Sequence, residues 1–374
     1  MKRICFVTTS PLIVNFFLVP HLRRLASRYE VSLAVTLPGE APLKDLPGVH
    51  VEPVTIPRRI RPLGDLRALQ RLTHLFRERR YALVHSFGPK AGLLSTWAGM
   101  RAGVPARLHT FTGQVWASRR GTMRALLRAA DRATARRATE VLADSASQRD
   151  FLIREGIVAA EHCRVLGAGS VCGVDAQRFR PDAAARAAVR AELGIGAQAP
   201  IVLFVGRVTR DKGVLDLAQA FGVLGAEYPE AVLLVVGPDE EGLGAQVRRL
   251  CGERARVVGY THTPERYMAA ADLLCLPSYR EGFGAVVIEA AAAGLPAIGS
   301  RIYGIVDAVQ DGKTGLLFEP GNVGELQAHL RRLLGDEALR EHLGTAARER
   351  ALKEFAEERL VGALEARYRQ ILGG

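Results

Sequence analysis

Residues 277–290 have the sequence PSYREGFGAVVIEA, which joins two apolar segments. The segment before it, 273–276, is short and uninterrupted, as in a buried strand. The segment 285–293 is apolar almost all round, as in a buried helix. Gly282 and Gly284 fall at the turn between them, where backbone N–H groups can approach a ligand. Because a helix N-terminus also favours negative charge, this turn is a candidate anion site.

One residue, Glu289, breaks the apolar pattern of the predicted helix. An unpaired buried carboxylate is costly, so Glu289 needs partners. A vicinal diol, as on a ribose, supplies two donors that match the two carboxylate oxygens. An arginine in an internal ion pair would serve as well, and this stretch alone leaves both interpretations open.

Strand and helix patterns alternate along the rest of the chain. The series begins with a strand at 4–7 and a helix at 15–29, and it restarts with a strand at 201–208. This spacing predicts an α/β protein with two parallel, doubly wound sheets. The glycine-rich segment 167–173 is typical of a linker between them.

We therefore predict two Rossmann-like domains, one over residues 1–172 and one over residues 173–356. The segment 357–374 has an apolar stripe and is predicted to be a helix that packs back on the first domain. Two such domains would face a cleft, because ligands of parallel sheets bind at the carboxyl ends of the strands.

The composition of the 374 residues, 48% hydrophobic and 24% charged, is that of a soluble globular protein. The five cysteines contain no CxxC pair, which argues against disulfides and zinc and favours a reducing cytoplasm. No apolar run approaches the ~18 residues that a membrane span needs. Residues 1–172 carry 27 Lys and Arg against 12 Asp and Glu, so this half either faces an anionic partner or is simply rich in arginine.

The predicted strand 201–208 leads into GRVTRDKG at residues 206–213. This is neither the Walker G-x4-GK-[ST] spacing nor G-x-G-x-x-G, so a nicotinamide dehydrogenase is poorly supported. Arg207 and Lys212 would lie at the carboxyl end of a strand, close to a helix N-terminus, where they can neutralise a diphosphate. Taken alone, two basic residues in a loop are more often solvated surface.

Three motifs occur together in this chain: E-x7-E at Glu281 and Glu289, G-R-x4-K-G at 206–213, and DGKTGLL at 311–317. On these motifs the chain resembles the retaining GT-B glycosyltransferases of glycosyltransferase family 4, over essentially its whole length. Two upstream segments, HSFGPKAG from residue 85 and HTFTGQVW from residue 109, look like those of bacterial members that build surface polysaccharide on a lipid carrier.

The chain departs from this family in two places. Many members carry a Gly-Gly pair after the first strand, where this chain has TSPL at residues 9–12. The role of that loop is therefore in doubt. Cys172 stands where an Asn usually precedes Gly-Val-Asp, and we expect only a local effect.

The resemblance implies that the N-terminal domain (1–172) binds the acceptor and the C-terminal domain (173–356) binds the nucleotide sugar. It also implies a role for each residue of the donor motifs. Glu289 would hold the ribose hydroxyls, and Arg207 and Lys212 would bind the diphosphate and stabilise it as leaving group. Glu281 would contact the donor sugar and the distal phosphate, together with the backbone amides of Gly282, Phe283 and Gly284.

His109, near the carboxyl end of its predicted strand, matches the histidine that the family places beside the donor sugar. A structural histidine is the alternative interpretation. With Glu281, Arg207 and Lys212 it completes the set that the resemblance implies to be catalytic. Further candidates for acceptor or cleft contacts are Ser10, Asn15, His85, Lys90, Thr112 and Gln114.

The implied activity is a retaining transfer of a sugar from a nucleotide diphosphate, with UDP as the expected nucleotide, to a hydroxyl of a lipid-linked or glycan acceptor. The chain has no Asp-x-Asp motif, so no metal and no cofactor is expected. The implied setting is cell-surface polysaccharide or glycoconjugate synthesis in the bacterial cytoplasm, peripheral on the inner face of the cytoplasmic membrane.

Residues 119–139 are expected to form a long helix, with Trp116 just upstream. This pattern predicts an interfacial helix that docks the N-terminal domain on an anionic membrane surface. A solvated helix packed on the sheet is the alternative. The arginines recur at three- and four-residue steps, at Arg119, Arg120, Arg124, Arg128, Arg132, Arg136 and Arg137.

Two other functions fit parts of the sequence. The basic half is compatible with a binding protein for nucleic acid or anionic surfaces, but no RRM, zinc-finger or basic-zipper signature occurs, and we expect no nucleic-acid partner. A GT-B fold could also serve an ADP-sugar synthase or a phosphorylase. The second half lacks an evident lysine context for pyridoxal phosphate, which counts against the phosphorylase.

Overall fold

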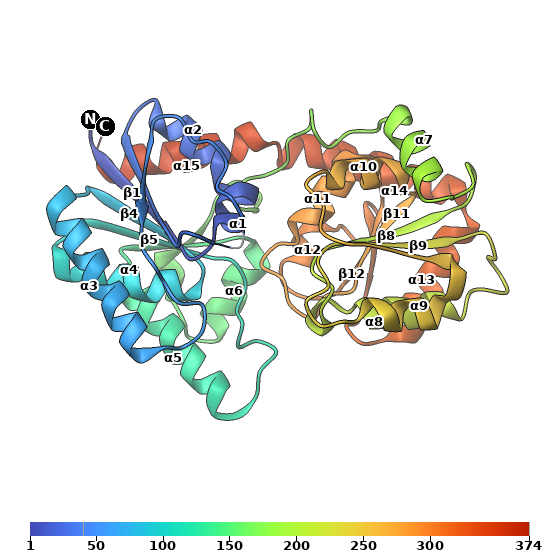
Figure 1. The fold of residues 1–374 in the computed structure, drawn as a ribbon, viewed down its shortest axis with the longest axis horizontal. Helices are drawn as coiled ribbons and strands as arrows, with labels where there is room; N and C mark the ends of the chain where they lie inside the picture. The colour runs from blue at the N-terminus through green and yellow to red at the C-terminus, as the bar shows by residue number, and fades with distance from the viewer. Residues whose placement is uncertain (40, 374) are drawn as a thin grey trace. The chain divides into compact units, whose positions relative to one another are not determined.

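The computed structural model describes residues 1–39 and 41–373, which divide into two compact units. Unit 1 comprises Met1–Gly173 and Glu357–Gly374, and unit 2 comprises Val174–Ala356 (Figure 1). Residues 40 and 374, which fall in the predicted segments 1–172 and 357–374, lie outside the described residues.

The core of unit 1 is a parallel sheet with the strand order β3-β2-β1-β4-β5-β6-β7. Side chains alternate across each strand, so Ile4 and Phe6 of β1 face one hydrophobic cluster while Cys5 and Val7 face another. Burial on both faces explains the apolar run of an inner strand such as β1, whereas the edge strand β3 is partly exposed and less apolar. The strands are β1 Arg3–Thr8, β2 Glu30–Val35, β3 Val49–Pro53, β4 Leu83–Phe87, β5 Ala106–Phe111, β6 Glu140–Ala143 and β7 Cys163–Val165.

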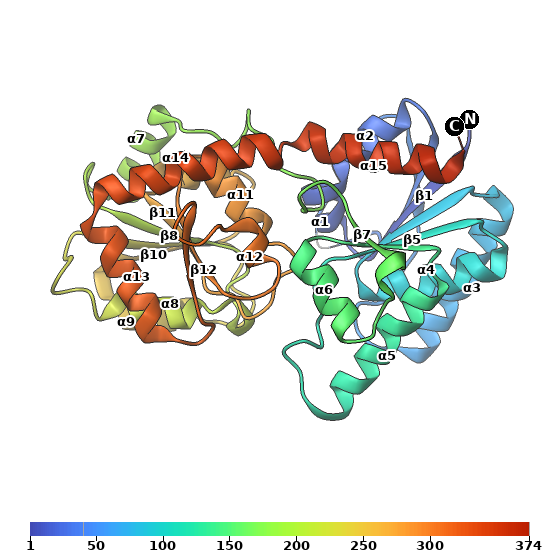
Figure 2. The ribbon, with the colours of Figure 1, turned by 180° about the vertical axis from the view of Figure 1, so that it is seen from behind.

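Helices cover both faces of this sheet. One face carries α3, α4, α5 and α6, and the other carries α2 and α15 (Figures 1 and 2). Their bounds are α2 Val19–Ala26, α3 Pro62–Arg79, α4 Pro89–Ala102, α5 Gly121–Arg137, α6 Ala146–Arg154 and α15 Glu357–Leu372.

The first helical segment begins earlier than the predicted residue 15. Ser10 caps it, because its Oγ accepts a hydrogen bond from the N–H of Leu12 at 3.2 Å. Pro11 then occupies the first helical position, which a proline tolerates because that N–H needs no partner. The chain continues through α1 (Pro11–Ile13) and a π-helical turn (Val14–Leu18) into α2. Ser followed by Pro is a helix-start signal, so the sequence does mark this position and the predicted start at residue 15 was too late.

The C-terminal helix α15 belongs to unit 1 and packs against α2. Its buried Glu365 accepts a hydrogen bond from Arg24 at 2.7 Å and pairs with Arg28 at 2.6 Å. Its Tyr368 hydroxyl lies 2.7 Å from Nδ1 of His85 in β4. These contacts tie the last helix to the first sheet.

The sheet of unit 2 is also parallel, in the order β10-β9-β8-β11-β12-β13. The chain winds from β8 to β10 in one direction and then crosses to β11 on the other side of β8. The topological switch point therefore lies between β8 and β11, where open parallel sheets bind ligands. The strands are β8 Ile201–Val205, β9 Val232–Val236, β10 Ala255–Val258, β11 Leu273–Leu276, β12 Ala297–Ser300 and β13 Gly315–Phe318.

Helices α7, α10, α11 and α14 pack on one face of this sheet and α8, α9 and α13 on the other (Figure 1). The two parallel sheets with helices on both faces confirm the predicted fold class. In the described part of the chain, no helix is long and apolar enough to cross a membrane. The helices of unit 2 are α7 Ala183–Glu192, α8 Val214–Gly222, α9 Gly244–Cys251, α10 Pro264–Ala270, α11 Ala285–Ala292, α12 Ile305–Ala308, α13 Val323–Gly335 and α14 Glu337–Glu354.

Candidate donor site

Two loops meet at the switch point of unit 2, 206–213 after β8 and 277–284 after β11. The backbone N–H of Tyr279 donates to the carbonyl of Asp211 at 2.9 Å. Gly213 has a positive φ of 69°, and a Cβ atom there would collide with the carbonyl oxygen of Pro277. Glycine is therefore required for the two loops to approach this closely.

The close approach brings Lys212 and Glu281 together. Lys212 Nζ lies 2.5 Å from Glu281 Oε1, and the Ser278 hydroxyl donates to the same oxygen at 2.9 Å. The side chains of Lys212 and Glu281 expose only 16% and 13% of their surface. Glu281 Oε2 has no hydrogen-bond partner among residues 1–39 and 41–373.

Arg207 is less constrained than Lys212. Its guanidinium lies 3.0 Å from Glu240 Oε2 and 4.0 Å from Asp211 Oδ2, and about half of the side chain is exposed. Exposed ion pairs of this kind contribute little, about 0–1 kcal/mol, so the side chain can move toward a ligand. Arg280 adds a third basic group, which donates to Asp211 Oδ2 at 3.0 Å.

Glu289 lies just over one turn into α11, and no hydrogen bond or ion pair of its carboxylate is found in the described part of the chain. Burial raises the pKa of the Glu289 carboxyl to about 7. The positive charge of Arg178 lowers this pKa but does not outweigh burial. Arg178 instead pairs with Glu265 at 2.8 Å. Of the two interpretations of Glu289, the internal ion pair is thus not the one the structure shows.

The turn 282–284 is held firmly at the start of α11. The Phe283 ring is buried against Phe355, with ring centroids 5.2 Å apart. Gly284 has a φ of 81° and precedes the first helical residue. A Cβ atom at Gly304 would lie 2.6 Å from the carbonyl oxygen of Gly282, so a second loop also packs against this turn.

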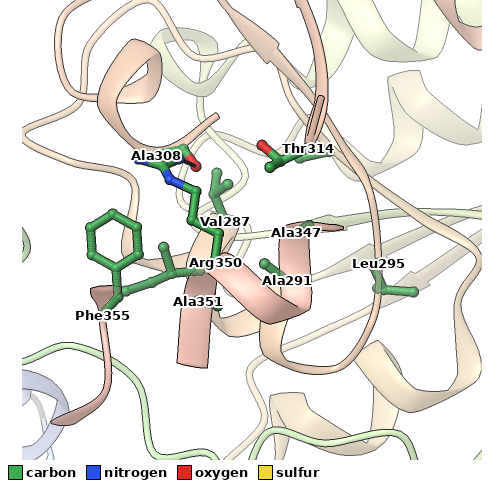
Figure 3. Close-up of a pocket in the computed structure, with 11 residues that line it drawn as sticks. Val287, Ala291, Leu295, Ala308, Thr314, Ala347, Arg350, Ala351 and Phe355 are labelled. Carbon is green, nitrogen blue, oxygen red and sulfur yellow. Dashed lines mark hydrogen bonds between the residues drawn. The ribbon is translucent and has the colours of Figure 1, made fainter. Parts of the chain in front are cut away.

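The far side of α11 faces a small, mostly apolar cavity, which Val287 and Ala291 of α11 line together with residues of α14 (Figure 3). At its edge Arg350 donates to the backbone carbonyls of Asp307 and Ala308 at the end of α12, at 2.7 and 2.9 Å. Arg350 thus anchors α12 next to the loop that packs against Gly282.

Unit 1 places His109 in β5, fully buried, with Nδ1 2.9 Å from the Ser86 hydroxyl. Burial lowers the pKa of His109 to about 3, so its imidazole is neutral. Its Nε2 has no partner within the described residues. Gly92 of α4 lies against the ring, where a Cβ atom would be 2.6 Å from Nδ1.

His85 has both ring nitrogens engaged inside unit 1. Nδ1 lies 2.7 Å from the Tyr368 hydroxyl, and Nε2 lies 2.7 Å from Thr110 Oγ1. Burial lowers its pKa well below the ordinary value. These contacts fit a structural role, and a role in acceptor binding stays a prediction.

The remaining candidates of unit 1 lie at the carboxyl edge of its sheet, and most also have structural contacts. Asn15 binds the loop at residues 42–44 through both ends of its amide. Lys90 pairs with Asp65 at 2.8 Å. Gln114 is buried and accepts a hydrogen bond from Gln148 at 3.4 Å. Ser10 caps α1, and the half-buried Thr112 directly follows β5.

Comparison with known proteins supports the same division of the chain. Residues 18–169 match the family model described as "Glycosyl transferase 4-like domain", and residues 185–350 match "Glycosyl transferases group 1". The capsular polysaccharide biosynthesis glycosyltransferase CapM of Staphylococcus aureus is 28% identical over 332 residues, 86% of this chain and 85% of that protein. An N-acetyl-alpha-D-glucosaminyl L-malate synthase of Bacillus anthracis is 33% identical, but the chain spans only 49% of its length.

Solved structures agree over nearly the full length. Sucrose-phosphate synthase from Thermosynechococcus elongatus superposes with a TM-score of 0.83 at 25% identity, covering 99% of both chains. HepE from Anabaena, in complex with UDP and glucose, gives 0.83 at 20% identity, covering 99% of this chain and 100% of HepE.

The chain belongs to the GT-B glycosyltransferases.

Sequence reasoning missed two members of the site of this glycosyltransferase. Ser278 shares Glu281 Oε1 with Lys212, and Asp211 joins the two loops through Arg280 and Tyr279. Asp211 lies within the basic motif, between Arg210 and Lys212. An acidic residue between two basic ones was the sequence feature that could have indicated its role. Ser278 had no comparable signal, because its role depends on the turn that follows β11.

The raised pKa of Glu289 predicts a pH-dependent cost to stability. The folded state holds this proton up to about pH 7, whereas the ordinary value is 4.5, so stability falls as the pH rises through that interval, by up to about 3 kcal/mol. Glu289→Gln removes the cost. We expect this variant to melt above the parent at pH 8 and to lose the difference near pH 4.5.

The measurement is a thermal-unfolding series across pH without ligand. Glu230→Gln, at an exposed position of the same unit, is the matched control and should follow the parent throughout. A difference between Glu289→Gln and the parent that does not change with pH would contradict the burial of an ionisable Glu289.

Proposed function

We propose that this glycosyltransferase moves a sugar from a UDP-sugar to a hydroxyl of a lipid-linked or glycan acceptor, with retention of the anomeric configuration. The observation that carries the proposal is the contact between Lys212 and Glu281 at the switch point of unit 2, next to the start of the helix that carries the partnerless Glu289. The alternative of a basic binding protein draws no comparable support, because the candidate diphosphate-binding residues Arg207 and Lys212 lie in unit 2, outside the strongly basic residues 1–172.

In this proposal Glu289 binds the ribose. Two hydroxyls of a vicinal diol donate to its two oxygens, and such donation favours the ionised carboxylate. The free energy that burial of Glu289 costs in the empty protein is then recovered when the nucleotide binds. A destabilising residue of this kind is expected at a binding site rather than in a purely structural position.

The diphosphate would lie between the two loops. Lys212 and Arg207 provide positive charge there, and the N–H groups at the start of α11 add their dipole. Because negative charge grows on the diphosphate as the sugar departs, fixed positive groups stabilise the transition state more than the ground state. Glu281 holds Lys212 in place through Oε1, which leaves Oε2 available for a hydroxyl of the donor sugar.

The acceptor hydroxyl would attack the anomeric carbon from the face that the diphosphate leaves. The bond from that carbon to the diphosphate oxygen breaks as the new glycosidic bond forms, and a diphosphate oxygen takes the hydroxyl proton. No side chain acts as nucleophile in this scheme. The neutral His109 would offer its Nε2 to the substrate rather than a charge.

The names of two similar proteins support a nucleotide-sugar donor and a glycan acceptor. CapM is named for capsular polysaccharide biosynthesis, and HepE was solved with UDP and glucose. We propose that the reaction needs no metal and no cofactor, since basic side chains occupy the place of a divalent ion. We also propose that the enzyme acts at the cytoplasmic face of the membrane, where lipid-linked acceptors are found.

Lys212→Ala should lower turnover by about 10²–10³-fold, because a fixed positive group at the leaving diphosphate is lost. The measurement is UDP release from a panel of UDP-sugars, together with the rise in melting temperature that UDP causes. Lys353→Ala, an exposed lysine of the same unit, should behave like the parent. Turnover of Lys212→Ala close to that of the parent would refute the donor-site assignment.

Transfer from an α-linked donor should produce an α-linked product and should continue in EDTA. NMR of the first-formed product reports the anomeric configuration, and an inverted linkage would exclude same-face attack. Loss of activity in EDTA with recovery on adding magnesium would contradict metal independence, without bearing on the stereochemistry.

A further inference from the structure

The imidazole of His109 makes one hydrogen bond where two are possible. Its Nδ1 lies 2.9 Å from Oγ of Ser86, whereas its Nε2 has no partner among the described residues. The whole side chain is buried, so water does not replace the missing partner at an open surface. A buried polar atom without a hydrogen bond is uncommon in folded proteins and needs an explanation.

The Ser86 hydroxyl decides which nitrogen of His109 carries the proton. Its Oγ lies within hydrogen-bond distance of Nδ1 and also lies 3.2 Å from the backbone carbonyl oxygen of Leu108. A carbonyl oxygen only accepts, and a hydroxyl has a single proton to give. If Ser86 donates to Leu108, it can only accept from His109. The assignment that makes both contacts hydrogen bonds therefore places the imidazole proton on Nδ1.

This assignment leaves Nε2 as an acceptor. Burial lowers the pKa of His109 to about 3, so near neutral pH the ring carries one proton and no charge. With that proton on Nδ1, Nε2 has a lone pair and nothing to donate. The missing partner must then be a hydrogen-bond donor, such as a hydroxyl. An oxygen of a phosphate or a carboxylate, which only accepts, does not fit.

The orientation of the His109 ring is fixed by its neighbours. Ser86 of β4 and His109 of β5 are register partners on adjacent parallel strands, which keeps the hydroxyl beside Nδ1. A Cβ atom at Gly92 would lie 2.4 Å from Cε1 of the ring, so α4 packs directly on the imidazole. Phe111 meets the ring edge-on, with centroids 4.5 Å apart and an interplanar angle of 89°. Rotation that would exchange the two nitrogens is therefore blocked.

The support behind Phe111 is also closed. Phe111 belongs to a hydrophobic cluster with Trp116, whose buried indole N–H donates to Asp131 at 2.7 Å. The guanidinium groups of Arg124 and Arg128 lie over the Trp116 ring, 5.4 and 5.5 Å from its centroid. Trp116 and these two arginines were predicted to lie at a membrane surface. They pack on unit 1 instead, so that part of the prediction was wrong.

We propose that Ser86 is a positioning residue of the transferase, which holds the His109 proton on Nδ1 so that Nε2 accepts a hydrogen bond from a hydroxyl of the donor sugar. The proposal rests on the proposed function, in which the donor sugar reaches His109. It adds a requirement on the substrate: the sugar must carry a hydroxyl at the position that faces His109. A sugar without that hydroxyl would leave Nε2 unpaired, at a cost that the correct sugar avoids.

The tautomer is measured directly by ¹⁵N NMR of the full chain with labelled histidines and no substrate. We expect the proton of His109 on Nδ1, and the same pattern from pH 8 down to pH 5 because the pKa is about 3. His109→Asn assigns the signals, because they disappear in that variant. Protonated Nε2 in the parent would overturn the proposal.

Two substitutions of Ser86 separate positioning from simple packing. In Ser86→Ala the Nδ1 proton loses its acceptor, so the NMR signals should shift toward the form with the proton on Nε2. Ser86→Thr keeps a hydroxyl and should restore the parent pattern. Ser95→Ala is the matched control, because it removes another buried hydroxyl of unit 1, one that donates to the carbonyl of Ala91 at 2.6 Å. It should leave the His109 signals unchanged.

Turnover then tests the contact with the sugar. The probes are the UDP-sugar that the parent turns over fastest and its monodeoxy analogues. One analogue should lose about 10–100-fold in kcat/KM with the parent and with Ser95→Ala. The same analogue should lose little with His109→Asn, since Asn reaches as far as Nδ1 but not Nε2, and an intermediate amount with Ser86→Ala. Equal losses in the parent and His109→Asn for every analogue would refute the contact.

The UDP-induced thermal shift distinguishes failure of this proposal from failure of the proposed function. All four variants should retain the shift, because the candidate donor site lies in unit 2. Absence of the shift and of turnover in the parent would refute the proposed function. The NMR measurement would still decide whether Ser86 holds the His109 proton on Nδ1.

Discussion

The close packing of the loop after β8 against the loop after β11 sets the geometry of the candidate donor site. It depends on Gly213, since any side chain there would strike Pro277, and on the hydrogen bond from Tyr279 to Asp211. Parallel pairing of β8 with β11 places both loops at one edge of the sheet. Lys212 and Glu281, which are distant in sequence, therefore meet at 2.5 Å. In the proposed function this pairing holds Lys212 in place before a diphosphate binds, whereas the exposed Arg207 moves toward it.

Glu289, in contrast to these loop contacts, destabilises unit 2 when no ligand is bound. A helix otherwise made of Ala, Val and Ile holds a carboxylate whose pKa burial raises to about 7. Two contacts keep the start of α11 in place despite the cost of the Glu289 carboxylate. Phe283 packs on Phe355, and Arg350 donates a hydrogen bond to the backbone of α12. Phe283, Phe355 and Arg350 thus stabilise this part of unit 2, and in the proposed function it is nucleotide binding that requires a carboxylate at residue 289.

The sequence predicted those elements whose signal lies within a few neighbouring residues. The apolar run 273–276 and the glycines after it predicted β11 and the turn that follows. Glu289 lies in the predicted apolar helix, where it is half-buried rather than fully buried. The strands β7 and β13 and the helices α6, α7, α12, α13 and α14 were not predicted. Brief segments such as β7 and α12 carry little periodic signal. In α13, by contrast, Leu326, Leu330 and Leu333 form a buried apolar stripe that the sequence does contain. The surroundings of Trp116 and of the α5 arginines were also not predictable, since Asp131 and Glu155 reach them only through the fold. His85 illustrates the same point, because its partner Tyr368 lies 283 residues away in sequence.

The central claim is that Glu289 recognises the two ribose hydroxyls of a nucleotide, and calorimetric titration tests it most directly. UDP and 2′,3′-dideoxy-UDP would each be titrated into the parent and into Glu289→Ala, which together form a double-mutant cycle. The account predicts that the parent binds UDP about 10–100-fold more tightly than the dideoxy analogue, as hydrogen bonds to a charged group would require, and that Glu289→Ala binds both alike. An equal loss of affinity for the analogue in both proteins would contradict it.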